Sequence, residues 1–228
     1  MKIVNYERGV TTLLVPMEEM RPANPPDITT AINAIKAHYG FGWAPDLNRT
    51  YDEVQKGPHT FSGGKLERDG KVISITKLQF FNDGIVVTSH STENADAIIE
   101  DLIEWGTKTF GYRPFQTVPT RLHNSAIAID MDFDLDHILG PHDELSRLFA
   151  EYLTPARPKA PVWKAATLRF TGIASPKEAP DMNNVFLIER RVDVPHEKNR
   201  YFSDAPLPTQ AHVRFLEALE KIVAGKAA

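Results

Sequence analysis

Residues 59–105, HTFSGGKLERDGKVISITKLQFFNDGIVVTSHSTENADAIIEDLIEW, decide the fold class. Two short segments in this stretch, Glu67-Arg68-Asp69-Gly70-Lys71 and Asn82-Asp83-Gly84, have the composition of tight hairpin turns, because Asn, Asp and Gly tolerate the backbone angles that such turns need. The turns connect three segments that read as strands, over about 59–68, 71–81 and 84–90. The stretch therefore predicts a three-stranded antiparallel meander.

A helix is predicted directly after the meander. Ser91 or Thr92 supplies an N-cap for it. The apolar residues that follow recur at spacings of three and four, which is typical of an amphipathic helix with one apolar face. They are Ala95, Ile98, Ile99, Leu102, Ile103 and Trp105. We expect this face to pack on the sheet.

Strand and helix patterns continue on both sides of this stretch. Upstream, the sequence predicts a strand over 10–15 and a helix over about 28–38, which begins after the N-cap Asp27 and ends at Gly40. Downstream, it predicts a strand over about 123–133, a helical segment over 136–153, strands over about 162–173 and 184–194, and a helix over about 209–224. The expected fold is α+β: an antiparallel sheet with helices packed on one face.

The order of elements nearly repeats along the chain. Residues 1–115 give the order β-α-β-β-β-α, and residues 116–228 give β-α-β-β-α. The sequence similarity between these halves is close to chance, so an internal duplication stays an open alternative. We expect a single compact domain or two tightly fused halves, with the helix-free face of the sheet available for binding.

Composition excludes several classes of protein. The 228 residues are 42% hydrophobic and 25% charged, and 26 Lys and Arg against 30 Asp and Glu give a formal net charge of −4. This balance argues against a general polyanion binder. Without cysteine, no disulfide or thiolate site can form. No secretory leader and no membrane-spanning stretch is recognised, and these observations predict a cytoplasmic protein.

An acidic stretch is the first candidate for chemistry. Asp130, Asp132 and Asp134 alternate with apolar residues, so a strand would place the three carboxylates on one face. With His137 they would suit Mg²⁺, Mn²⁺ or Ca²⁺, and the protein would then be a metal-dependent hydrolase or phosphoryl-transfer enzyme. The alternative is a solvated acidic face that protects a sheet edge and caps the next element.

Two aromatic loops next to glycines are the second candidate. One loop follows the first predicted helix and the other follows the helix after the meander. Such side chains can line an apolar pocket or anchor a partner, or they can close the end of the core. The candidate binding residues are Tyr39, Phe41, Trp43, Tyr112, Arg113 and Phe115.

The sequence contains no recognisable catalytic motif and resembles no family closely enough to name one. Its leading interpretation is a non-catalytic binding protein without a cofactor, which holds a partner protein or an apolar small molecule on the sheet face and the aromatic loops. The metal-dependent enzyme is the alternative. Acidic residues mixed among the arginines argue against nucleic-acid binding, and a homodimer is compatible with either interpretation.

Overall fold

The structure is a computed structural model that describes residues 1–20, 22, 26–45, 58–135, 147, 166–171 and 184–226. Its strands form one eight-stranded antiparallel sheet in the order β2-β3-β4-β1-β5-β8-β7-β6. With the helices packed against it, the sheet confirms the predicted α+β class. Beyond β1 the strands β4, β3 and β2 follow in reverse chain order, and beyond β5 the strands β8, β7 and β6 do the same. The duplication itself remains a prediction.

The chain divides into two compact units, each described here by itself. The N-terminal unit comprises Tyr6–Ser125 and Leu207–Thr209, and the C-terminal unit comprises Met1–Asn5, Ala126–Pro206 and Gln210–Ala228. Strands β1 (Lys2–Leu14) and β5 (Thr120–Asp130) have residues in both units.

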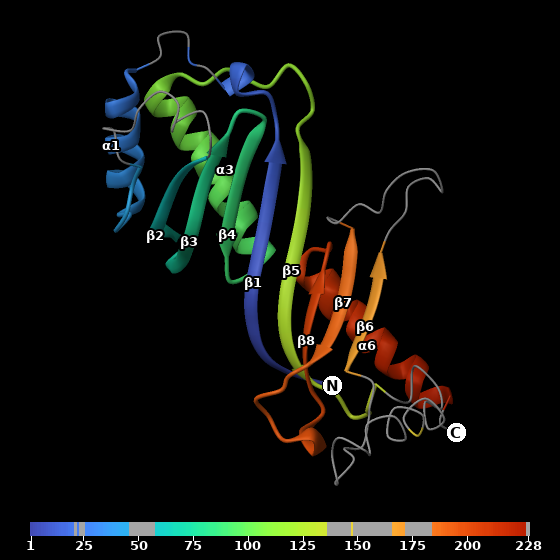
Figure 1. Cartoon of the computed structure of the whole chain (residues 1–228). Helices are drawn as coiled ribbons and strands as arrows, with labels where there is room; N and C mark the ends of the chain where they lie inside the picture. Colours follow the sequence, from blue (N-terminus) through green and yellow to red (C-terminus); the bar gives the residue numbers. More distant parts are fainter. Residues whose placement is uncertain are drawn as a thin grey trace. The chain divides into compact units, whose positions relative to one another are not determined.

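The N-terminal unit contains the predicted meander. It consists of β2 (His59–Arg68), β3 (Lys71–Phe81) and β4 (Gly84–Ser89), and β4 pairs with β1. Asp69 and Gly70 have φ values of 53° and 72°, as the hairpin prediction requires. Figure 1 shows helix α3 (Thr92–Phe110) running behind β3 and β4. The Ser91 hydroxyl caps α3 by accepting a hydrogen bond from the Asn94 N–H.

Helix α1 (Ile28–Tyr39) and α3 share one core with the sheet. The Asp27 carboxylate caps α1 by accepting the Thr30 N–H at 2.9 Å, and Gly40 ends the helix with a φ of 61°. A four-residue 3-10 helix, η1 (Met17–Met20), precedes α1. The buried core includes Ile32, Phe61, Leu78, Ile98 and Leu102.

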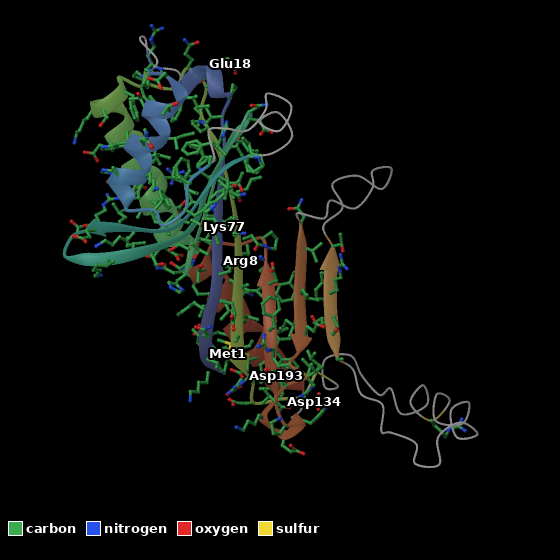
Figure 2. All side chains as sticks on the ribbon, turned by 60° about the vertical axis from the view of Figure 1, so that its left-hand side comes forward. Met1, Arg8, Glu18, Lys77, Asp134 and Asp193 are labelled. Atoms are coloured by element: carbon green, nitrogen blue, oxygen red, sulfur yellow. The ribbon has the colours of Figure 1, made fainter. Side chains whose placement is uncertain are left out.

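The helix-free face of the N-terminal unit is largely polar. The pairing register places Val10, Thr88, Lys77 and Ser62 in one row across this face, with Thr12, Val86, Gln79 and Thr60 in the next row. Lys77 and Arg8 are labelled on their strands in Figure 2. The face therefore offers isolated apolar side chains among hydroxyl and amide groups and the ammonium group of Lys77.

The C-terminal unit is built from the remaining strands and one long helix. Its elements are β6 (Thr167–Thr171), β7 (Val185–Arg190), the 3-10 helix η2 (His196–Lys198), β8 (Arg200–Ala205) and α6 (Thr209–Lys226). The core includes Ile127, Ile188, Tyr201 and Leu216.

Several predicted boundaries were wrong. Strand β1 begins at Lys2 instead of residue 10, β5 ends at Asp130 instead of 133, and β7 is shorter than predicted. Strand β6 covers Thr167–Thr171, and residues 162–165 and 172–173 of its predicted range lie outside the described residues. Strand β8 was missed. The helical segment predicted over 136–153 falls outside the described residues except for residue 147.

Candidate functional site

A cavity of about 330 Å³ lies in the N-terminal unit. It is formed by the first half of α1, the start of β2, the end of β3 and the segment where α3 ends. The lining residues are Pro22, Pro26, Ile28, Ala31, Ile32, Ile35, His59, Phe61, Phe80, Phe81, Asn82, Phe110 and Tyr112. The volume is near the lower end of the range for small-molecule sites.

The lining is apolar apart from three side chains. His59, Asn82 and Tyr112 are the polar members, and among the described lining residues none is Asp, Glu, Lys or Arg. Aromatic rings and branched aliphatic chains make up most of the wall. A surface of this kind favours an apolar ligand and offers a few positions for hydrogen bonds.

Helix α1 supplies its wall through the spacing of its apolar residues. Ile28, Ala31, Ile32 and Ile35 recur at intervals of three and four, so all four lie on one side of the helix. Ile32 and Ile35 are buried, whereas Ile28 is more than half exposed. This side of α1 therefore extends from the core to the mouth of the cavity.

A chain of aromatic rings runs beside the cavity. Phe80 contacts Phe61, Phe61 contacts Phe41, and Phe41 contacts Tyr39, with ring centroids between 5.3 and 6.0 Å apart. A second run joins Trp105, Phe110 and Tyr112 at 5.1 and 5.9 Å. Tilted and edge-on packing of this kind is favourable beyond the area it buries, which stabilises the shape of the wall.

One carboxylate ties α1 to α3 behind this wall. Asp101 Oδ2 accepts the Tyr39 hydroxyl at 2.9 Å and lies 3.1 Å from His38 Nε2. The imidazole of His38 also stacks on Trp105, with centroids 4.3 Å apart. Burial, followed by the negative charge of Asp101, raises the pKa of the Tyr39 phenol, so Tyr39 stays protonated and acts as the donor.

Tyr112 is positioned by a glycine of α3. A Cβ atom at Gly106 would lie 2.2 Å from Tyr112 Cε2, so the ring packs against the bare backbone at this position. Burial raises the pKa of the Tyr112 phenol. No hydrogen bond from this hydroxyl is found among the described residues.

The predicted aromatic residues occupy different environments. Tyr39 and Phe41 are buried in the core of the N-terminal unit, and Tyr112 and Phe115 pack partly buried against it. Of the six predicted binding residues, only Tyr112 lines the cavity. Trp43 is 46% exposed and pairs through its backbone with Ser62, and Arg113 is exposed.

Most of the cavity was not predicted from the sequence. The spacing of Ile28, Ala31 and Ile35 gave one signal, and Phe80-Phe81-Asn82 at the second hairpin gave another. Neither segment by itself indicates that the other lies opposite it across a cavity, because the two segments are far apart in the sequence.

The three predicted metal-binding carboxylates have separate partners. Arg200 holds Asp130 through two hydrogen bonds of 2.7 and 3.0 Å, and Arg190 Nη2 donates to Asp134 at 2.8 Å. Asp132 is 87% exposed and lies 3.2 Å from the amino group of Met1. Figure 2 shows Met1 and Asp134 at the same end of the C-terminal unit.

The predicted alternation of these carboxylates needs a strand, and β5 ends at Asp130. His137 lies outside the described residues. Within the described ranges, no group of three His, Asp or Glu side chains is placed to hold a metal ion. The hydrogen bonds from Arg200 lower the pKa of Asp130, which keeps this carboxylate ionised and paired.

A buried serine–histidine pair in the C-terminal unit was also missed. Ser203 Oγ lies 2.9 Å from His212 Nε2 and donates to the Leu187 carbonyl at 3.0 Å. Both side chains are fully buried. Because the serine proton is already donated to a backbone carbonyl, this arrangement is that of a satisfied polar group in a core, and it differs from a hydrolase dyad in which histidine accepts that proton.

No protein-family model matches the chain, and no curated protein matches it in sequence. In the part of the chain that the structure describes, no helix combines the length and the apolar character needed to cross a membrane.

Proposed function

We propose that the protein is a non-catalytic binding protein that holds an apolar small molecule in the cavity of its N-terminal unit. The observation that carries this proposal is the composition of the cavity wall, where aliphatic and aromatic side chains surround about 330 Å³. The aromatic chain behind the wall and the bond from Tyr39 to Asp101 support a preformed site.

The energetics favour weak binding. A ligand that buries about 250 Å² of apolar surface gains roughly 6 kcal/mol. Loss of translational and rotational freedom offsets part of this gain. For a ligand of two fused or linked rings, roughly 0.3 kcal/mol per non-hydrogen atom leaves a net of about 4 kcal/mol, which corresponds to a Kd on the order of 1 mM.

Ala31→Phe is expected to block the cavity. The new ring would occupy the space beside Ile35 and Phe61, because Ala31 lines the cavity. The measurement is a titration with N-phenyl-1-naphthylamine, a dye whose emission rises in apolar sites. We expect saturable binding to the unmodified protein and a loss of at least about tenfold in affinity for the variant, since the wall and the dye would compete for the same volume.

Ala37→Phe is the matched control for this experiment. Ala37 lies on the same helix but is exposed and absent from the lining. We expect it to bind the dye as the unmodified protein does. Equal binding by all three proteins, or no saturable binding at all, would contradict the proposal.

The other functional predictions remain predictions. A partner protein on the sheet face, a homodimer and a cytoplasmic location are all compatible with the proposed cavity. The small molecule is favoured over a partner protein because the cavity is concave, whereas the rows across the helix-free face are mainly polar.

A further inference from the structure

The polar groups of the cavity define the chemistry of its ligand more closely. We propose that the ligand is an uncharged apolar molecule with a hydrogen-bond acceptor, and that the Tyr112 hydroxyl donates to this acceptor. This inference rests on the proposed function. Two independent features of the wall lead to this inference: the charges it lacks and the way in which Tyr112 is held.

The first feature is the absence of ionised side chains from the described lining. An ionised carboxylate or ammonium group moved from water into such a wall would lose its hydration without gaining an opposite charge. Asp101, which ties α1 to α3 behind the aromatic wall, already accepts the Tyr39 hydroxyl and contacts His38. An uncharged ligand avoids this loss of hydration.

The second feature is the environment of Tyr112. Its ring packs against Gly106, which fixes the phenol beside the cavity at little cost in side-chain freedom. A tyrosine phenol is protonated at neutral pH, and burial raises the pKa of Tyr112 further, so its oxygen carries a proton to donate. The two tyrosines therefore differ: the buried Tyr39 donates to Asp101, whereas the partly buried Tyr112 has no acceptor for its hydroxyl among the described residues.

A series of three naphthalene derivatives tests the inference. 2-Acetonaphthone is uncharged and has a carbonyl acceptor, 2-isopropenylnaphthalene has nearly the same shape without the carbonyl, and 2-naphthoate is an anion. Binding of each is measured by calorimetry to the unmodified protein and to Tyr112→Phe. Tyr6→Phe, which removes the hydroxyl of an exposed tyrosine in the same unit, is the control.

We expect 2-acetonaphthone to bind about fivefold more tightly than the hydrocarbon, as one hydrogen bond provides. 2-Naphthoate should bind at least about tenfold more weakly than the ketone. In Tyr112→Phe the preference for the ketone over the hydrocarbon should disappear while the affinity for the hydrocarbon stays the same. Tyr6→Phe should retain the preference.

The outcomes separate this inference from the proposed function. If none of the three compounds binds saturably, the cavity itself is not a binding site. Two other results would overturn the inference about the ligand while leaving the cavity as a binding site. One is that the hydrocarbon binds in the cavity but 2-naphthoate binds equally well. The other is that Tyr112→Phe retains the preference for the ketone.

Discussion

Gly9→Ala is expected to destabilise the N-terminal unit by about 3 kcal/mol or more, because the added methyl group would meet backbone atoms. Gly9 lies on β1 opposite Ser89, at the point where the chain turns into α3. A Cβ atom here would lie 2.0 Å from the Ser91 carbonyl carbon and 2.2 Å from the Thr92 nitrogen. Side chains can change rotamer to relieve such a contact, but these backbone atoms cannot.

The start of α3 has little freedom to move away from this methyl group. The Thr92 N–H donates to Thr209 Oγ1 at 2.9 Å, and the Thr209 N–H donates to Thr92 Oγ1 at 2.7 Å. Both threonines are buried. Displacing Thr92 would therefore leave buried donors unpaired as well as strain the turn.

Gly42→Ala is the matched control for Gly9→Ala. The nearest atom to a Cβ at Gly42 is the Gly63 carbonyl oxygen at 3.9 Å, which is an ordinary contact. Urea unfolding of both variants gives the comparison. A large drop in midpoint for Gly9→Ala and a small change for Gly42→Ala are expected, whereas equal midpoints would contradict the close approach of β1 and α3.

Asp134→Leu is expected to destabilise the C-terminal unit by about 3 kcal/mol, because it leaves a buried guanidinium without its counter-ion. The exposed fractions of the Arg190 and Asp134 side chains are only 10% and 12%. Arg190 also donates to the Tyr201 hydroxyl and to the His196 carbonyl, and it lies 4.7 Å from the centre of the Tyr201 ring. These neutral partners orient the guanidinium but do not balance its charge.

The double variant Arg190→Met and Asp134→Leu separates the lost pair from the unpaired charge. Removing both charges should recover part of the stability lost in Asp134→Leu. Urea unfolding of the two single variants and the double variant measures this coupling. If the double variant loses the sum of the two single losses, the pair is not coupled and the prediction fails. Glu67→Gln, in the exposed pair with Lys65, should leave the midpoint unchanged.

The parts of the fold that were predicted from the sequence depend on local signals. The two hairpin signals and the N-caps Asp27 and Ser91 act within a few residues, and the structure places turns at residues 69–70 and 82–83 and helix starts after the two caps. The first half of β1 was missed because the alternation Val4-Asn5-Tyr6-Glu7 extends over only four residues. Residues 4–8 are all exposed, so no buried face marks this part of the strand. Strand β8 has only six residues, and only Asn199 separates it from the 3-10 helix η2.

The candidate site was harder to predict, because its walls come together only in the tertiary structure. The two aromatic loops do meet in one core, but Tyr39 and Phe41 fill that core and leave Tyr112 at the cavity. The acidic stretch had the composition of a metal site, and local sequence could not reveal that Arg190 and Arg200 pair with Asp134 and Asp130. Those arginines lie more than fifty residues along the chain from their partners.

The most direct test of the proposed function is an NMR titration of protein labelled at the isoleucine δ1-methyl groups, with 2-acetonaphthone as the ligand. We predict saturable shifts of the methyl signals of Ile28, Ile32 and Ile35, which line the cavity. The signals of Ile129 and Ile188, in the core of the C-terminal unit, should stay in place. Saturable shifts confined to other methyl groups, or no saturable shift at any isoleucine, would contradict the proposal that this cavity binds an apolar small molecule.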